Sequence, residues 1–273
     1  MSYGCNLSQL FSRLFFILTL SAFTLPTSLA DQGIMSDGTA INKAGRQRML
    51  SERMVKAYVQ LSIGVDVARA EEQLSYATEL FAAQLALLKA YAPTNNIVHN
   101  LNAVEQQWFK VFGILNNQPE IDNIPELIIL GEQLVARCHQ VVLDIQRFSG
   151  TSSAVLVNIS GRQRMLSQRM AKYYFAHLAG QRQKETVTRF ENSLAEFEKG
   201  LSDLTNAPEN NSEIRLALNK VKAQLNFSKS GFKRLNEGNY TPHVISRTTE
   251  SMLKRMESIT QQYATLHDKL QTS

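Results

Sequence analysis

Apolar residues recur three and four positions apart along nearly every long segment of the chain, and sustained alternation of apolar and polar residues is almost absent. That spacing places apolar side chains on one face of an α-helix. The pattern therefore predicts an all-α fold. Clusters of Gly, Pro and Asn divide the chain into eight helices, which we expect at residues 38–63, 66–91, 97–117, 122–149, 153–179, 182–206, 211–237 and 241–271.

One segment of ten residues occurs twice in the chain. The sequence GRQRMLSERM at residues 45–54 recurs at residues 161–170, where Gln168 stands in place of Glu52. The same offset of 116 residues aligns apolar positions such as Phe81 with Phe197. We interpret the chain as an internal duplication that folds as two tandem antiparallel four-helix bundles.

A short polar junction at residues 149–153 separates the two repeats and predicts domains at 31–150 and 151–273. Four antiparallel helices bring a chain back to the end where it began, and a junction this short cannot carry it far. We therefore expect the helix at 153–179 to start close beside the helix at 38–63. The two copies of the ten-residue motif would then lie side by side and parallel.

The first thirty residues have the features of a secretory signal. Arg13 is their only charge, an apolar run spans residues 14–25, and Ser28-Leu-Ala30 resembles a cleavage site. We expect cleavage before Asp31 and a periplasmic protein, with an uncleaved signal anchor as the alternative. The apolar run is shorter than the roughly 20 residues of a comfortable membrane span.

Composition narrows the function classes. The formal net charge of the chain is +5, and it falls to +4 without Arg13, which is too small for a nucleic-acid footprint but suits small anions. Cys138 would be the single cysteine after cleavage, so no internal disulfide is expected. The chain shows no Gly-rich phosphate loop, no nucleophile elbow and no histidine pair at metal-ligand spacing. We therefore predict no catalytic residues, no cofactor, no metal and no nucleic-acid partner.

The repeated motif carries the candidate chemistry. On a helix, Gly45 and Arg48 share one stripe, as do Gly161 and Arg164. Glycine inside a helix costs about 1 kcal/mol relative to alanine, so these glycines favour a close helix approach or backbone exposed to a ligand. Two guanidinium groups brought together repel each other, whereas an anion between them forms charge-assisted hydrogen bonds. We therefore hypothesise an anion site between Arg48 and Arg164.

The alternative to an anion site is that each arginine is solvated or forms an ion pair with a glutamate one turn away on the same helix. Glu52 has that spacing from Arg48, but its counterpart Gln168 carries no charge, so such a pair does not explain Arg164. The methionines of the motif are expected in the core, and Arg46, Arg53, Arg162 and Arg169 either at the surface or around the site behind its binding residues. The residues expected to support the site are Asn42, Asn158, Met49, Met165, Glu52 and Gln168.

Residues 40–54 resemble the periplasmic-box helix of nitrate/nitrite sensor histidine kinases and, more closely, the N-terminal module of type IV pilus methyl-accepting chemotaxis transducers. The Arg-Gln pair at 46 and 47 is of the transducer type. The resemblance implies a four-helix bundle that pairs through its first helix, where one arginine from each copy and backbone at the glycine hold one nitrate. Those roles fall on Arg48 and Arg164 and on Gly45 and Gly161.

The sequence therefore predicts an exported sensor-type module that binds a small inorganic anion, nitrate or nitrite first. Because it lacks signalling parts of its own, we expect a membrane receptor or a sensor kinase as partner. A homodimer with sites between chains is a further arrangement. The alternative function is a protein-protein interaction module that docks a membrane receptor or pilus component without a small ligand. An anion site requires the two arginines to converge, whereas a docking surface requires them apart and exposed.

Overall fold

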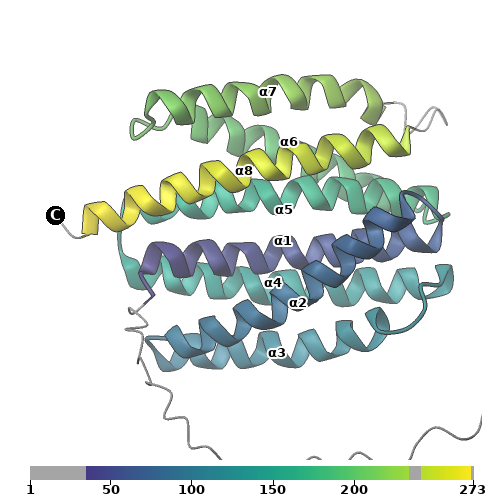
Figure 1. Cartoon of the computed structure of the whole chain (residues 1–273), viewed down its shortest axis with the longest axis horizontal. Helices are drawn as coiled ribbons and strands as arrows, with labels where there is room; N and C mark the ends of the chain where they lie inside the picture. Colours follow the sequence, from purple (N-terminus) through teal and green to yellow (C-terminus); the bar gives the residue numbers. More distant parts are fainter. Residues whose placement is uncertain (1–34, 234–240, 272–273) are drawn as a thin grey trace, which may run out of the picture. The chain divides into compact units, whose positions relative to one another are not determined.

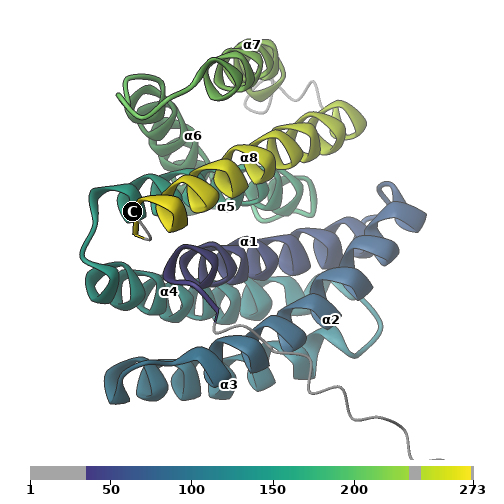
Figure 2. The ribbon, with the colours of Figure 1, turned by 60° about the vertical axis from the view of Figure 1, so that its left-hand side comes forward.

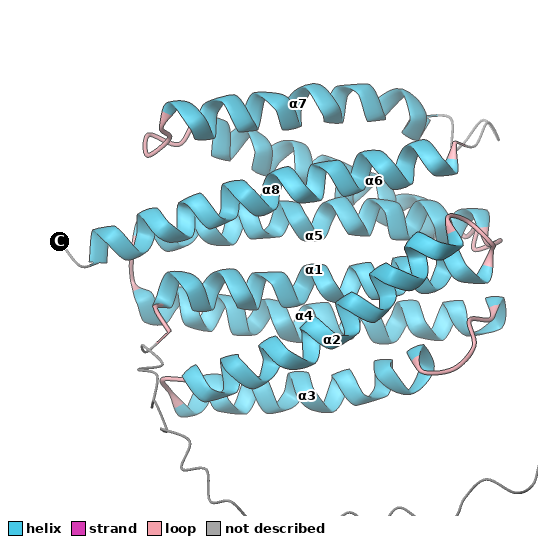
Figure 3. Cartoon of the chain, viewed as in Figure 1, coloured by secondary structure: helices cyan, strands magenta, loops and turns pink. Residues whose placement is uncertain are grey.

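A computed structural model describes residues 35–233 and 241–271, so the signal sequence and its cleavage site lie outside the described residues. The regular structure of the described part is helical throughout (Figures 1 and 3). Its elements are α1 (Asp37–Ser62), α2 (Val67–Tyr91), α3 (Asn95–Leu115), the short 3-10 turn η1 (Ile121–Asn123), α4 (Ile124–Ser149), α5 (Ser152–Leu178), α6 (Lys184–Thr205), α7 (Ser212–Lys233) and α8 (Pro242–Gln271). The all-α prediction is confirmed, and the expected end of the seventh helix at 237 lies outside the described residues.

Capping and glycine geometry explain where the central helices begin and end. Ser36 caps α1, because its side chain accepts a hydrogen bond from the Thr39 amide at 3.3 Å. Gly64 follows α1 with φ 69°, and its counterpart Gly180 follows α5 with φ 93°. Gly150 ends α4 with φ 70°. A left-handed residue closes a helix at low cost only when it is glycine, so the three positions fix the turns.

The helices are arranged around α1 and α5. Residues Ile34–Ser273 form one compact unit, and the contact between α1 and α5 is the most extensive of all helix pairs in its described part. Helix α4 packs on α1 and α8 packs on α5, with α2 and α3 on one side and α6 and α7 on the other (Figures 1 and 2). The contacts thus give two four-helix sets, α1–α4 and α5–α8.

The motif copies lie side by side and parallel, as the sequence predicted. Gly45 faces Gly161 near the start of the two helices, and Lys56 bonds to Gln168 further along. Paired positions that advance together in both helices require a parallel alignment. The two repeats are therefore related by an approximate twofold axis that runs between α1 and α5.

Candidate functional site

Arg48 on α1 and Arg164 on α5 meet between the central helices. Both are buried, with 1% and 0% of their surfaces exposed. Each reaches across to the other helix: Arg48 Nη2 donates to the Asn158 carbonyl at 3.3 Å, and Arg164 Nη2 donates to the Asn42 carbonyl at 3.1 Å. The two arginines thus cross-brace α1 and α5 in a reciprocal arrangement.

Gly45 and Gly161 make this convergence possible. A Cβ atom at Gly45 would lie 3.3 Å from Arg164 Nη2 and 3.4 Å from Arg48 Nη2, and at Gly161 the two distances would be 3.2 Å and 3.5 Å. A Cβ at either position would also lie 3.9 Å from the opposite Cα. Both guanidinium groups therefore lie over the same small patch of backbone, which only glycine leaves open.

The two arginines differ in their outer partners. Arg164 Nη1 forms an ion pair with Glu257 of α8 at 2.6 Å, whereas Arg48 Nη1 contacts His139 Nδ1 of α4 at 3.0 Å. Glu257 is also the ion-pair partner of Arg46. Arg46 and Arg164 therefore share one carboxylate, and Arg48 has a neutral neighbour where Arg164 has a charged one.

The cluster of Arg48 and Arg164 contains more positive than negative charge. Burial and, to a smaller extent, nearby Arg162 lower the pKa of Arg48 to about 9, yet the guanidinium stays charged at neutral pH. Burial, with Arg46 and Arg48, likewise lowers the pKa of Arg164. The Nε atoms of both arginines find no hydrogen-bond partner among the described residues. Two buried cations with spare donors are an arrangement that a small anion would stabilise.

Acidification is expected to weaken the fold through His139. Burial and then Arg48 lower the pKa of His139 from 6.5 to about 4, so the ring is neutral at pH 7 and accepts from Arg48. As the pH falls, the unfolded chain takes up the proton first, and the free energy of unfolding decreases between about pH 6.5 and pH 4. His139→Gln should lose less stability from pH 7 to pH 4.5 in urea unfolding. Equal losses in the two proteins would contradict this role.

A second polar level lies one turn further along the central helices. Glu52 of α1 pairs with Lys172 at 2.8 Å and with Arg169 at 2.6 Å, both from α5. Glu132 of α4 contacts the same two cations and accepts from the Tyr173 hydroxyl at 2.8 Å. Burial opposes the charge of Lys172, but Glu132 and Glu52 more than offset it and raise its pKa. The charges of this cluster are therefore balanced.

The equivalent cluster in the other half of the molecule, around Lys56, has one negative charge fewer. Lys56 donates to Gln168 at 2.9 Å and to Gln73 at 2.7 Å, and Glu250 lies 3.4 Å away. Arg53 pairs with the same glutamate at 3.1 Å. Burial outweighs Glu250 and lowers the pKa of Lys56 to about 8. The replacement of Glu52 by Gln168 in the second copy of the motif thus leaves this cluster without one buried negative charge.

The structure brings the predicted site residues together at two levels. Arg48, Arg164, Gly45 and Gly161 meet in one cluster, and the Asn42 and Asn158 backbones bind the arginines. The side-chain amides of the two asparagines instead donate to Gln261 and Gln146. Met49 and Met165 belong to the hydrophobic core, whereas Glu52 and Gln168 pair with the buried lysines.

Sequence reasoning missed the partners on α4 and α8. An offset of 118 residues, two more than in the motif, aligns Glu132 with Glu250 and His139 with Glu257. Realigning the fourth helices separately would have shown the repeated glutamate. The spacing of apolar and polar residues does not indicate that Arg48 contacts a histidine whereas Arg164 contacts a glutamate.

Within residues 35–233 and 241–271, no helix has both the length and the apolar character needed to cross a membrane. Structurally, the chain is a tandem pair of four-helix bundles built around two parallel helices that carry a repeated motif. The family model described as "Type IV pili methyl-accepting chemotaxis transducer N-term" matches residues 33–118 and 148–272. The chain belongs to this family and is a sensor-type module. The resemblance of residues 40–54 to the pilus-transducer module is confirmed, and the two matched segments fall on the two repeats.

Searches of the curated proteins and of the solved structures found no significant match.

Proposed function

We propose that this module binds a small inorganic oxyanion, nitrate or nitrite first, between Arg48 and Arg164. The observation that carries the proposal is the convergence of two buried guanidinium groups over Gly45 and Gly161. A planar oxyanion matches the fork of each guanidinium, and backbone at the glycines would complete its surroundings. Bound there, the anion would replace the repulsion between the two cations with charge-assisted hydrogen bonds.

The inequality of the arginine partners favours an ion with one negative charge. Glu257 already supplies a carboxylate to Arg164, whereas His139 supplies none to Arg48. One added negative charge would neutralise Arg48, which is the fully buried guanidinium without a carboxylate, whereas Arg46 keeps 23% of its side chain exposed to water. A dianion would leave an excess charge in a buried place, which is costly.

The alternative is a docking surface for a membrane receptor or pilus component in which the motif arginines are the contact residues. Such a surface needs the two side chains exposed and apart. Their burial and mutual approach support the anion proposal instead. We further propose that the module lies in the periplasm and reports its bound state to a membrane receptor or a sensor kinase.

Nitrate and nitrite are expected to raise the melting temperature of the purified protein more than sulfate and phosphate do. A ligand at about one hundred times its Kd adds about 2.7 kcal/mol to the free energy of unfolding, a rise of about 5–10 °C for a chain of this size. Differential scanning fluorimetry in a buffer of weakly binding anions measures the rise. Arg48→Ala should remove it.

Two glycine variants provide a matched pair for the same measurement. Gly45→Ala places a methyl group 3.3 Å and 3.4 Å from the arginine nitrogens, where the anion would lie, and should abolish the response. Gly113→Ala meets nothing within 4 Å in α3 and should keep it. No rise with any of the four anions in a cooperatively melting wild-type protein would overturn the proposal.

A further inference from the structure

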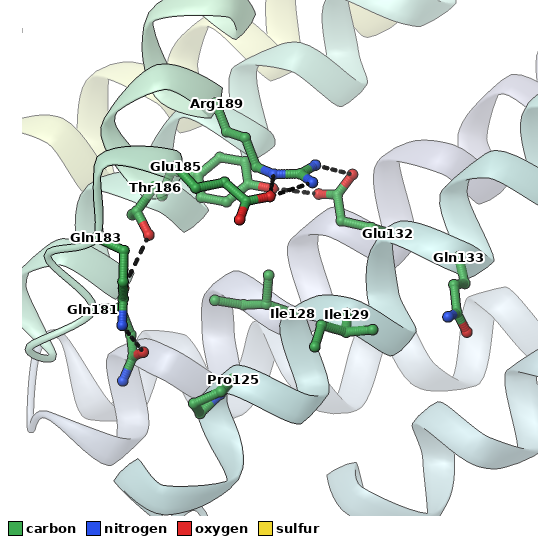
Figure 4. A pocket seen from close by; sticks show the side chains of 11 residues that line it. Pro125, Ile128, Ile129, Glu132, Gln133, Gln181, Gln183, Glu185, Thr186 and Arg189 are labelled. Carbon is green, nitrogen blue, oxygen red and sulfur yellow. Dashed lines mark hydrogen bonds and ion pairs between the residues drawn. The ribbon is translucent and has the colours of Figure 1, made fainter.

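A cavity of about 380 Å³ lies outside the arginine cluster, where α4 of the first repeat faces α5 and α6 of the second. Figure 4 shows its two kinds of wall. On one side stand Ile128 and Ile129 of α4, and Ile129 is 59% exposed. On the other stand charged side chains from α4 and α6. Such a volume, with an apolar wall and a few converging polar groups, is typical of a site for a small organic molecule.

The charged wall consists of Glu132, Glu185 and Arg189. Arg189 donates to Glu185 Oε1 through Nε at 2.9 Å and Nη2 at 2.7 Å. Its Nη1 is 3.8 Å from Glu132 Oε2, beyond hydrogen-bond distance. The guanidinium therefore spans two carboxylates and is fully bonded to only one.

The three groups differ in how firmly they are held. Glu132 is fixed from behind by Lys172, Arg169 and the Tyr173 hydroxyl, and despite its burial, these cations lower its pKa to about 2. The Glu185 and Arg189 side chains are 72% and 45% exposed. An exposed ion pair contributes at most about 1 kcal/mol, so a ligand can part Arg189 from Glu185 at little cost.

We propose that this cavity binds a free α-amino acid with an aliphatic or aromatic side chain. The carboxylate of the ligand would pair with Arg189 and its ammonium with Glu185 and Glu132. Its side chain would pack on Ile128 and Ile129. Because Lys172 and Arg169 together balance Glu52 and Glu132, Glu185 and Arg189 are left as one negative and one positive charge, which a zwitterion complements.

The equivalent place in the other repeat lacks these features. Gln73 stands where Arg189 does, and its amide donates to Glu250, the counterpart of Glu132, at 2.6 Å. Ala57 stands where Tyr173 does. Gln73 is only 6% exposed, so a neutral side chain covers that carboxylate. An arginine in this position is therefore particular to the second repeat, and the argument from it is independent of the anion proposal.

Isothermal titration calorimetry of the purified protein tests the site with L-leucine and L-phenylalanine. Their amides lack the carboxylate, and their N-acetyl derivatives lack the ammonium. The free amino acids should bind, and both derivatives should bind at least tenfold more weakly, because each loses one charge-assisted contact of about 1.5–3 kcal/mol. Arg189→Gln should weaken the free amino acids by a similar factor.

Two further variants serve as controls for the effect of Arg189→Gln on binding. Lys229→Gln removes an ion pair of similar exposure with Glu198 on α6 and should leave binding unchanged. Arg48→Ala should also leave it unchanged, which separates this site from the arginine cluster. The proposal is overturned if neither amino acid binds the wild-type protein, if a derivative binds as tightly as the free amino acid, or if Arg189→Gln retains full affinity.

Discussion

Lys172→Met is expected to lower the free energy of unfolding by about 3–5 kcal/mol, because it leaves two carboxylates, one of them fully buried, with Arg169 as their one shared cation in the described part of the chain. Lys172 is fully buried between Glu52 and Glu132, and it lies 2.8 Å from the first. Glu52 is itself fully buried, so water cannot replace the lost contact. Urea unfolding followed by circular dichroism measures the loss. A loss below 1 kcal/mol would show that the cluster tolerates an uncompensated charge.

Lys56→Met provides the matched control across the twofold axis. Lys56 bonds two neutral glutamines and lies 3.4 Å from Glu250, which retains Arg53 and Gln73 in the variant. The loss at pH 7 should therefore be clearly smaller than for Lys172→Met. Because the pKa of Lys56 is about 8 in the folded chain, below its usual 10.5, the unfolded chain binds more protons between these values. Wild-type stability from this group should therefore rise from about pH 8 to pH 10.5.

His139→Glu is expected to weaken the binding of nitrate at least tenfold. The substitution gives Arg48 the carboxylate that Glu257 already gives Arg164, so the fixed side chain would supply the negative charge otherwise supplied by the ligand. The affinity for nitrate should fall at least tenfold, since a charge-assisted bond contributes about 1.5–3 kcal/mol. Calorimetric titration at pH 7 measures the change.

His139→Gln is the control for this substitution. Glutamine is neutral and keeps an acceptor for Arg48, so nitrate binding should be retained. If the glutamate variant bound nitrate as well as the wild-type protein, Arg48 would not be the group that the anion neutralises.

Much of the fold could be predicted from the sequence because the repeat constrains it twice. Apolar spacing and Gly or Pro turns placed the first helix at 38–63, and the structure has Asp37–Ser62. The short junction after α4 predicted that α5 would start beside α1, and the reciprocal bonds of Arg48 and Arg164 lie between these helices. The glycines at 45 and 161 indicated a close approach, which their positions confirm.

The polar interior could not be predicted from the same signals. Helices α1 and α5 are surrounded by other helices, so Lys56 and Lys172 are buried although lysine is normally exposed. Periodicity separates apolar from polar faces, but it does not reveal which polar residue pairs with which. Glu132 and His139 belong to a helix more than seventy positions away from the first motif, and only tertiary packing brings them to it.

The covalent link between the two repeats affects how the site depends on protein concentration and how the two copies can evolve. Helices held in one chain meet at an effective concentration that dilution does not change, so a site between α1 and α5 would be equally complete in scarce and abundant protein. In a homodimer, every mutation enters both helices at once. Here each copy mutates alone, and differences such as Gln168 for Glu52 can tune one half of the molecule while the other stays as it was.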